Sequence, residues 1–381
     1  MKLVIFGLSV SSSWGNGHAT LWRGLIRALG RRGHQTVFYE RDVAYYASHR
    51  DLTELPGLRL ELYEDWPGVR EAARRELADA DVAMVTSFCP DGADACELVQ
   101  QSRAGISVFY DLDTPVTLDK LRDGERVPYI GRAGLEPFDL VLSYTGGPAL
   151  ENLKTRLGAR QVAPLYGHVD PSLHRPVEPQ PHYRADLSYL GTYAADRQKA
   201  LEALLVDPAR RMPGHRFVIG GAMYPPGFPW TANIHFVRHL PPGEHPAFFA
   251  SSRITLNVTR RAMAAMGWCP SGRLFEAAAC GTPVLSDRWD GLEHFYEPGR
   301  EILLASTTEE AIAAISMLDG ELRQIGDAAR ERTLTEHTAE HRAAELERLL
   351  ESADGPALQT AAAQPTGDGY GPAAPQPRAV T

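Results

Sequence analysis

The stretch SGRLFEAAACGTPVLS, residues 271–286, decides the fold. It predicts a short loop, then a helix of small residues, then a Gly-Thr-Pro turn that leads into a buried strand. The alanines at 277–279 have little bulk, so this helix can lie close to whatever packs against it. Its first turn carries Arg273 and Glu276, which are three residues apart and therefore share one helical face.

That first turn has the features of a nucleotide-binding site. Free backbone N–H groups at a helix start, here after Ser271, favour anions, and the adjacent Arg273 strengthens that preference. A carboxylate one turn further in, Glu276, can accept two hydrogen bonds from a vicinal diol such as a ribose. Phosphate and ribose together predict a nucleotide. The alternative is an ordinary helix after a strand with an Arg–Glu pair on its surface, and the spacing alone leaves it open.

The rest of the chain alternates strands with helices, which predicts parallel, doubly wound sheets. Five prolines between residues 164 and 184 break any regular element and predict the connection between two domains. Helices are expected at 20–29 and 338–350. Strands are expected at 3–7, 36–39, 82–86, 106–110 and 140–143 in the first half, and at 187–190, 217–220, 235–236, 254–257, 283–285 and 302–304 in the second.

Composition excludes several classes of protein. The 381 residues leave room for two domains, and the net charge of −9 argues against a nucleic-acid surface. We find no leader sequence and no apolar run of the roughly 20 residues that a membrane span needs, so we expect a cytoplasmic protein. The four cysteines lack metal-type spacing. The excess of arginine over lysine suggests a bacterial genome rich in G and C.

Several blocks of the chain, in order, resemble one family. They are WGNGHA (14–19), YDLDTP (110–115), LSYLGTY (187–193), LNVTR (256–260), RLFE (273–276) and the run 286–304. They are similar to glycosyltransferases of the two-domain GT-B fold, and most similar to the glycosyltransferase-like group named after the spore maturation protein CgeB. The resemblance implies two Rossmann-like domains that face each other across a cleft, binding of a nucleotide sugar mainly by the second domain, and catalysis without a metal. It also implies that the final helix crosses back to the first domain.

One position departs from the family pattern. In the broader family a second glutamate, which contacts the donor sugar, lies eight residues before the one that matches Glu276. Here that position holds Trp268. The resemblance therefore still implies a ribose-binding role for Glu276, but it no longer implies a retaining mechanism.

The loop 9–18 follows the first strand and opens a helix. Gly15 and Gly17 let the backbone approach a ligand closely, and the helix start favours a phosphate. Thr20 stands where a Gly-x-Gly-x-x-Gly motif needs its third glycine, so a Rossmann dinucleotide site is not expected. His18 is the loop's only imidazole and a candidate general base toward an acceptor hydroxyl. The alternative is a histidine that only hydrogen-bonds the backbone.

Asp111 and Asp113 follow the strand at 106–110, and they are candidate catalytic residues that position the donor sugar or the acceptor. Paired carboxylates also suit a divalent ion, but the GT-B resemblance and the lack of a nearby third carboxylate argue against a metal. Capping of the next turn by Asp113 is the competing interpretation. The loops 9–18, 87–94 and 111–115 all follow parallel strands, so they are expected to converge at one sheet edge.

In the second domain the candidate donor-binding residues lie at two further strand ends. Arg197 and Lys199 resemble the basic pair that holds donor phosphates in relatives, since a guanidinium can bind phosphate oxygens bidentately. A solvated helix start is the alternative for both. The full candidate set here is Gly191, Thr192, Arg197, Lys199, Asn257 and Arg260, together with Ser271, Arg273 and Glu276.

These observations predict a metal-independent glycosyltransferase with a nucleotide-diphosphate sugar as co-substrate, no cofactor, and an unknown acceptor that is a glycan, a lipid-linked molecule or a small molecule. Peripheral membrane association is left open. The rival hypotheses are a nucleotide-sugar epimerase and a catalytically degenerate nucleotide-sugar-binding scaffold. The expected organisation is an acceptor-side domain (1–165), a linker (166–185), a nucleotide-sugar domain (186–335), a C-terminal helix (336–352) and a disordered tail (353–381).

Overall fold

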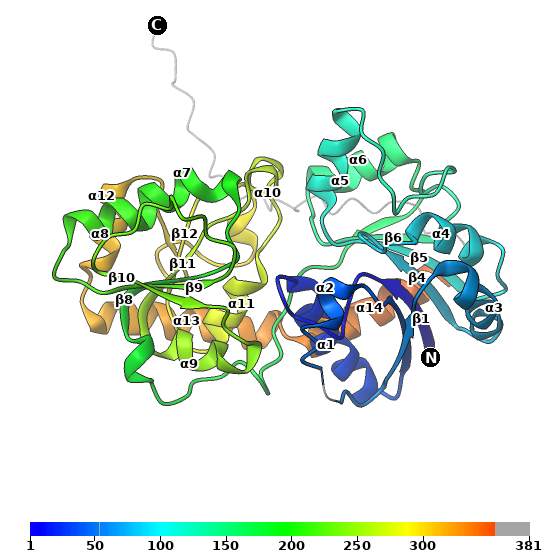
Figure 1. Ribbon diagram of the computed structural model, residues 1–381, viewed down its shortest axis with the longest axis horizontal. Helices are drawn as coiled ribbons and strands as arrows, with labels where there is room; N and C mark the ends of the chain where they lie inside the picture. The colour runs from blue at the N-terminus through cyan, green and yellow to red at the C-terminus, as the bar shows by residue number, and fades with distance from the viewer. Residues whose placement is uncertain (53, 355–381) are drawn as a thin grey trace, which may run out of the picture.

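The computed structural model describes residues 1–52 and 54–354, which form two α/β lobes side by side (Figure 1). The N-terminal lobe holds a parallel sheet in the order β3-β2-β1-β4-β5-β6-β7. Its strands are β1 (Lys2–Gly7), β2 (Gln35–Arg41), β3 (Leu58–Tyr63), β4 (Val82–Thr86), β5 (Ile106–Asp111), β6 (Leu140–Ser143) and β7 (Val162–Pro164). Its helices are α1 (Gly17–Arg31), α2 (Ala44–Ala47), α3 (Trp66–Leu77), α4 (Gly92–Gln100), α5 (Thr114–Arg122) and α6 (Pro148–Leu157).

The C-terminal lobe holds a second parallel sheet, in the order β10-β9-β8-β11-β12-β13. Its strands are β8 (Ala185–Leu190), β9 (Phe217–Gly221), β10 (Ile234–Arg238), β11 (Ser252–Asn257), β12 (Val284–Ser286) and β13 (Leu303–Leu304). Its helices are α7 (Gln198–Leu201), α8 (Asp207–Arg211), α9 (His245–Ala250), α10 (Arg261–Met266), α11 (Gly272–Ala279), α12 (Thr308–Ile315) and α13 (Asp319–Glu336), and a π-helical segment, Glu202–Val206, joins α7 to α8. The two doubly wound sheets confirm the predicted fold class.

Alternating side chains of the N-terminal sheet build two cores, one on each face. Leu3 and Ile5 of β1 pack with Trp22 of α1 on one face, whereas Val4 and Phe6 pack with α3 and α4 on the other. Both faces are buried because helices cover both, as in other parallel sheets. The carboxyl ends of the strands are left free to carry loops, and these ends face the other lobe.

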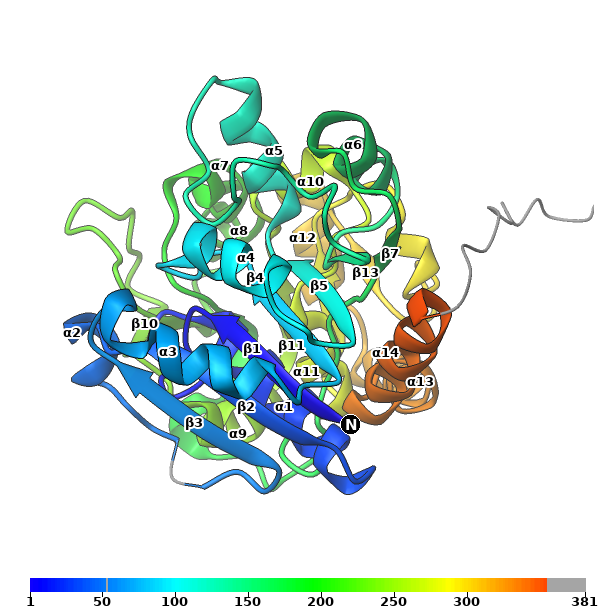
Figure 2. The ribbon, with the colours of Figure 1, turned by 90° about the vertical axis from the view of Figure 1, so that its right-hand side faces the viewer.

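The last helix, α14 (Ala339–Asp354), leaves the C-terminal lobe and packs on the N-terminal one (Figures 1 and 2). Its apolar side joins the core beneath α1. Its polar side binds α1 and the turn after it: Glu347 pairs with Arg32 and accepts a 2.6 Å hydrogen bond from His34 Nε2. Arg32 holds the pKa of Glu347 down at about 2. The crossing implied by the resemblance is confirmed. The helix extends to Asp354, and the expected tail beyond it lies outside the described residues.

The small-residue helix α11 does lie close to a neighbour. Its neighbour is α13, and a Cβ added at Gly326 of α13 would stand 2.4 Å from the carbonyl oxygen of Gly281, just after α11. Ala277, Ala278 and Ala279 are buried, and they belong to the same core cluster as Ala329 of α13. The close packing fixes α11, and with it the direction in which Arg273 and Glu276 point.

Candidate functional site

A cavity of about 530 Å³ lies between the two lobes. Most of the residues predicted from the sequence line it: Gly15, Gly17, His18, Asp113, Gly191, Thr192, Arg197, Arg260, Ser271, Arg273 and Glu276. Asp111, Lys199 and Asn257 do not. The cavity therefore brings together residues as far apart in the chain as Gly15 and Glu276, and both lobes contribute to it.

The glycine loop of the N-terminal lobe is held from behind by one buried carboxylate, Glu40 of β2. Glu40 accepts hydrogen bonds from the hydroxyls of Ser9 and Ser11 (2.9 and 2.6 Å) and from the backbone N–H groups of Val10 and Ser11 (2.8 and 3.0 Å). This network fixes the path of the loop into α1. Glu40 is not among the residues predicted from the sequence, because nothing in its local sequence indicates that it is buried.

The loop ends at the N-terminus of α1, which faces the cavity. Asn16 caps the helix by accepting a hydrogen bond from the backbone N–H of His18 at 3.0 Å. Gly15 has a φ of +60°, a conformation that side chains other than glycine rarely adopt. The first backbone N–H groups of α1 thus border the space where an anion is expected.

His18 and Asp113 form a pair on the N-terminal wall of the cavity. His18 Nε2 lies 2.9 Å from Asp113 Oδ2, and the two side chains are 19% and 20% exposed. His18 Nδ1 is buried and has no hydrogen-bond partner among the described residues. The loop after β4 reaches the same place, since the Phe88 ring lies 6.0 Å from that of His18. The predicted convergence of the three loops is therefore confirmed.

Asp111 lies behind this pair. It is completely buried, its Oδ1 accepts a hydrogen bond from the backbone N–H of Asp113 at 3.1 Å, and its Oδ2 has no partner among the described residues. Burial raises the pKa of Asp111 to about 6. Its place beneath the loop suits it to hold Asp113 in position.

The raised pKa of Asp111 predicts that removing its charge stabilises the folded protein by an amount that depends on pH. The folded carboxyl keeps its proton up to about pH 6, whereas the unfolded one loses it near 3.8. The folded state therefore binds more protons between these values, so stability falls as the pH rises through this window. Above it the buried charge costs about 3 kcal/mol. We expect Asp111→Asn to raise the free energy of unfolding at pH 8 by about 2–3 kcal/mol, and to change it little at pH 4, in urea titrations. An equal effect at both pH values would contradict this.

Two arginines approach the cavity from the C-terminal lobe. Arg273 Nη1 donates a 3.1 Å hydrogen bond to Asn257 Oδ1, and its guanidinium carbon lies 5.2 Å from the centre of the Tyr189 ring. Arg197 Nη1 donates to the carbonyl of Thr192 at 3.3 Å. Burial lowers the pKa of Arg273 from its ordinary value, and the nearby Arg197 adds to this effect.

Neither of these arginines forms an ion pair within the described residues, and the Nε atoms of both are buried without a hydrogen-bond partner there. Arg260, in contrast, pairs with Asp196 at 3.3 Å. Lys199 is exposed, outside the cavity lining. The unbalanced charge of the cavity wall therefore comes from Arg197 and Arg273, which makes this part of the cavity a site for an anion.

Glycines let the strand ends of the C-terminal lobe come together beside these arginines. Gly221, at the end of β9, has a φ of +153°, and a Cβ there would lie 2.1 Å from the carbonyl oxygen of Gly191. A Cβ at Gly191 would in turn lie 3.0 Å from Arg273 Nη2. Glycine at these positions keeps the backbone close to the guanidinium and leaves the cavity open above it.

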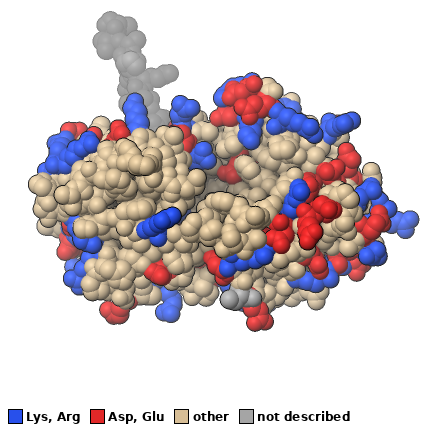
Figure 3. Space-filling model, in the orientation of Figure 1, with Lys and Arg blue, Asp and Glu red and all other residues tan. Residues whose placement is uncertain are grey.

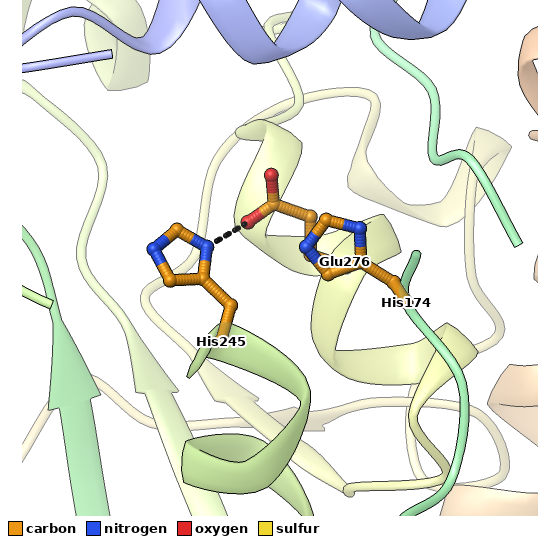
Figure 4. Close-up of side chains that lie close together, drawn as sticks. All are labelled: His174, His245 and Glu276. Atoms are coloured by element: carbon orange, nitrogen blue, oxygen red, sulfur yellow. Dashed lines mark ion pairs between the residues drawn. The ribbon is translucent and has the colours of Figure 1, made fainter. Parts of the chain in front are cut away.

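Glu276 lies one turn after Arg273 and is 15% exposed. Two histidines that are not among the predicted site residues, His174 and His245, lie beside its carboxylate (Figure 4). Neither belongs to a recognisable motif. They are 71 residues apart in the chain, and only the folding of the connection between the lobes against α9 brings them together.

Trp268, which occupies the position of the missing family glutamate, does not line the cavity. Its φ is +52°, and its carbonyl oxygen accepts a 2.9 Å hydrogen bond from the N–H of Gly146 in the N-terminal lobe. Its ring covers Gly147 and Gly291 so closely that a Cβ at either would lie under 2.5 Å from a ring atom. This position is therefore a contact between the lobes.

Comparisons with known proteins agree with this architecture. A family model described as "Glycosyl transferase-like" matches residues 197–348, which span the C-terminal lobe from Arg197 into α14. No curated protein matches the chain. The sucrose-phosphate synthase of Thermosynechococcus elongatus has a similar structure, with a TM-score of 0.66 and 16% identity, and the match covers 92% of this chain and 98% of the synthase.

Two other solved structures carry a nucleotide. HepE of Anabaena in complex with UDP-glucose matches with a TM-score of 0.66 and 12% identity over 92% of this chain and all of HepE. An alpha-glucosyltransferase in complex with UDP and a 13-mer DNA matches with a TM-score of 0.67 and 12% identity over 92% of this chain and 99% of that one. The chain has the GT-B fold. The fold and the family match together support a glycosyltransferase.

None of the helices described for this GT-B chain is long and apolar enough to cross a membrane. On the face drawn in Figure 3, lysines and arginines lie among aspartates and glutamates over both lobes and form no continuous basic surface. The four cysteines are buried and free.

Proposed function

We propose that this protein transfers a sugar from a nucleoside-diphosphate sugar to an acceptor hydroxyl, without a metal ion in the reaction. The donor's nucleotide lies against the C-terminal lobe, and the acceptor enters from the N-terminal lobe. The observation that carries this proposal is the pair Arg197 and Arg273, which place uncompensated positive charge on a cavity that α1 and α11 also border with their N-termini.

The chemistry of the donor matches this wall. A diphosphate takes two arginine forks and the backbone N–H groups of helix starts, which together do the work that a divalent ion does elsewhere. Ser271 caps α11, and Arg273 and Glu276 follow on one face. In this arrangement Arg273 holds the phosphates while Glu276 accepts hydrogen bonds from the ribose. UDP is the first nucleotide to test, because HepE and the alpha-glucosyltransferase are both seen with UDP.

On the opposite wall, His18 and Asp113 supply the acid–base chemistry. His18 takes the proton of the acceptor hydroxyl, and the Asp113 carboxylate stabilises the imidazolium that forms. Because Nε2 is paired with Asp113, Nδ1 is the nitrogen left for the acceptor, and it has to become accessible from its buried position when the acceptor enters. Asp113 itself, which also lines the cavity, is the competing base.

Glu276 gives the direct test of the donor site. Loss of a charged hydrogen-bond partner typically costs about 1.5–3 kcal/mol. We therefore expect Glu276→Ala to weaken UDP binding about ten- to a hundredfold by calorimetry in EDTA, with an unchanged melting temperature. Glu293→Ala removes an exposed glutamate outside the cavity lining and should leave the affinity unchanged. Equal affinities of wild type and Glu276→Ala in a folded variant would exclude the ribose contact.

A scaffold that binds the nucleotide sugar without turnover is the second candidate. The feature that favours it is Trp268, whose ring serves the contact between lobes, so the glutamate that would read the donor sugar has no counterpart at this position. Incubation with UDP-glucose separates the two: hydrolysis or transfer supports the enzyme, whereas tight binding with neither supports the scaffold.

A further inference from the structure

Three side chains from separate parts of the fold meet on the wall of the cavity: His174 from the connection between the lobes, His245 at the start of α9, and Glu276 of α11. Figure 4 shows the two imidazoles beside the Glu276 carboxylate. One nitrogen of each histidine and one carboxylate oxygen all lie within 4.8 Å of one another, and His245 Nδ1 stands 3.9 Å from Glu276 Oε2. This set is one that transition metals prefer.

The hydrogen bonds of His245 determine what its ring offers. Its Nε2 lies 3.3 Å from the carbonyl oxygen of Leu240, and a carbonyl can only accept, so Nε2 carries the hydrogen. Nδ1 is then a bare lone pair, buried and without a partner among the described residues. In the neutral form of the ring, Nδ1 and the Glu276 carboxylate oxygen 3.9 Å away are two acceptors that face each other with no hydrogen bond between them.

His174 is a second, independent sign of a missing ligand. It is 6% exposed, and neither of its ring nitrogens has a hydrogen-bond partner among the described residues. A buried polar group without a partner destabilises the folded state. The ring centre of His174 lies 6.0 Å from that of His245, so a single ligand can reach both.

A divalent cation can bind one nitrogen of each histidine and one carboxylate oxygen of Glu276 at the same time. We propose that His174, His245 and Glu276 form a binding site for a divalent transition metal, with Zn²⁺ the ion that fits best. Zinc bonds to nitrogen and oxygen are about 2.0–2.2 Å long, so the ligand atoms close in by about 1 Å around the ion. The bond from His245 Nε2 to a backbone carbonyl is the usual outer contact of a zinc-bound histidine.

Zinc bound at this site prevents the nucleotide sugar from binding. Here the argument rests on the proposed function: if Glu276 binds the ribose, one carboxylate serves both ligands, so zinc and the nucleotide exclude each other. Zinc then occupies the site when no donor is bound, and it inhibits the enzyme. Transfer itself should survive exhaustive chelation with EDTA, because the proposed reaction uses no metal.

The metal is tested alone first, on tag-free protein stripped with EDTA. We expect Zn²⁺ to bind one to one in calorimetry and Co²⁺ to give visible absorption bands of a nitrogen-containing site. His174→Gln and His245→Gln should each weaken zinc binding by at least about 10–100-fold, the loss that even an outer partner of a metal ligand causes. His239→Gln is the matched control, because His239 lines the same cavity outside the cluster. No one-to-one binding, or equal affinity in all three variants, would overturn the site.

Competition is tested next, with uridine, which has a ribose but no phosphates to chelate the ion. Uridine should lower the apparent zinc affinity of wild type, and added zinc should inhibit transfer competitively with the donor. Zinc binding that uridine leaves unchanged would overturn the shared use of Glu276. The first experiment contains no nucleotide, so it tests the metal site alone. If the protein does not bind UDP, the proposed function fails, but the zinc titration still shows whether the metal site exists.

Discussion

Replacing His18 with alanine should lower turnover by about 10²–10⁴-fold and leave UDP affinity nearly intact. The reason is its position: His18 lies on the N-terminal wall, paired with Asp113 at 2.9 Å, while the phosphate- and ribose-binding candidates lie on the other lobe. Imidazole is the side chain that most readily takes up and releases a proton at physiological pH, which suits a general base. Single-turnover rates with saturating donor, together with calorimetry with UDP, measure the two effects separately.

Two further measurements distinguish loss of the general base from a general disturbance of the site. Added imidazole should restore part of the activity of His18→Ala, because a free base can occupy the space that the ring leaves. Asp113→Asn keeps a side chain of the same size and removes its charge, so it should cost less than His18→Ala if Asp113 only supports the histidine. A larger loss in Asp113→Asn would make the aspartate the base. Equal losses in binding and turnover for His18→Ala would instead make His18 a donor ligand.

Local sequence was enough to place the parts of the site that depend on one helix. Arg273 and Glu276 lie on one face of α11 because they are three residues apart, and a helix that follows a parallel strand starts at the sheet's carboxyl edge. The same argument put the loops that carry His18 and Asp113 at one edge. It did not predict the pair that they form, because 95 residues separate them and their contact depends on the exact path of both loops.

The features that could not be predicted from the sequence are those that depend on tertiary packing. The strands β3 and β7 were missed, because β3 is a partly exposed edge strand with charged residues and β7 has only three residues. Glu40 is an acid within a strand that sequence reasoning places in water, yet it is fully buried under the glycine loop. His174 and His245 belong to no motif. Trp268 was noticed as a departure, but its contact with Gly146 and Gly147 becomes visible only once both lobes are in place.

Arg273 should act mainly by stabilising the diphosphate leaving group. As the bond to the sugar breaks, negative charge grows on the diphosphate, and a guanidinium already fixed in place stabilises that charge without reorganising. Arg273 is fixed by Asn257 and by the Tyr189 ring, and it forms no ion pair within the described residues. Loss of one such preorganised donor typically costs about 10²–10³-fold in turnover. We expect a loss of this size in Arg273→Lys, which keeps the charge but removes the planar fork.

The binding assay distinguishes a phosphate contact from a general disturbance of the site. Arg273→Lys should weaken UDP binding but leave uridine binding unchanged, because uridine has no phosphates. Arg288→Lys is the matched control, since Arg288 is exposed, pairs with Glu310 on the surface and lies outside the cavity lining. Equal losses for UDP and uridine would show that the substitution disturbs the Glu276 turn as a whole. Unchanged UDP affinity and turnover in a folded Arg273→Lys would leave Arg197 as the arginine that holds the diphosphate.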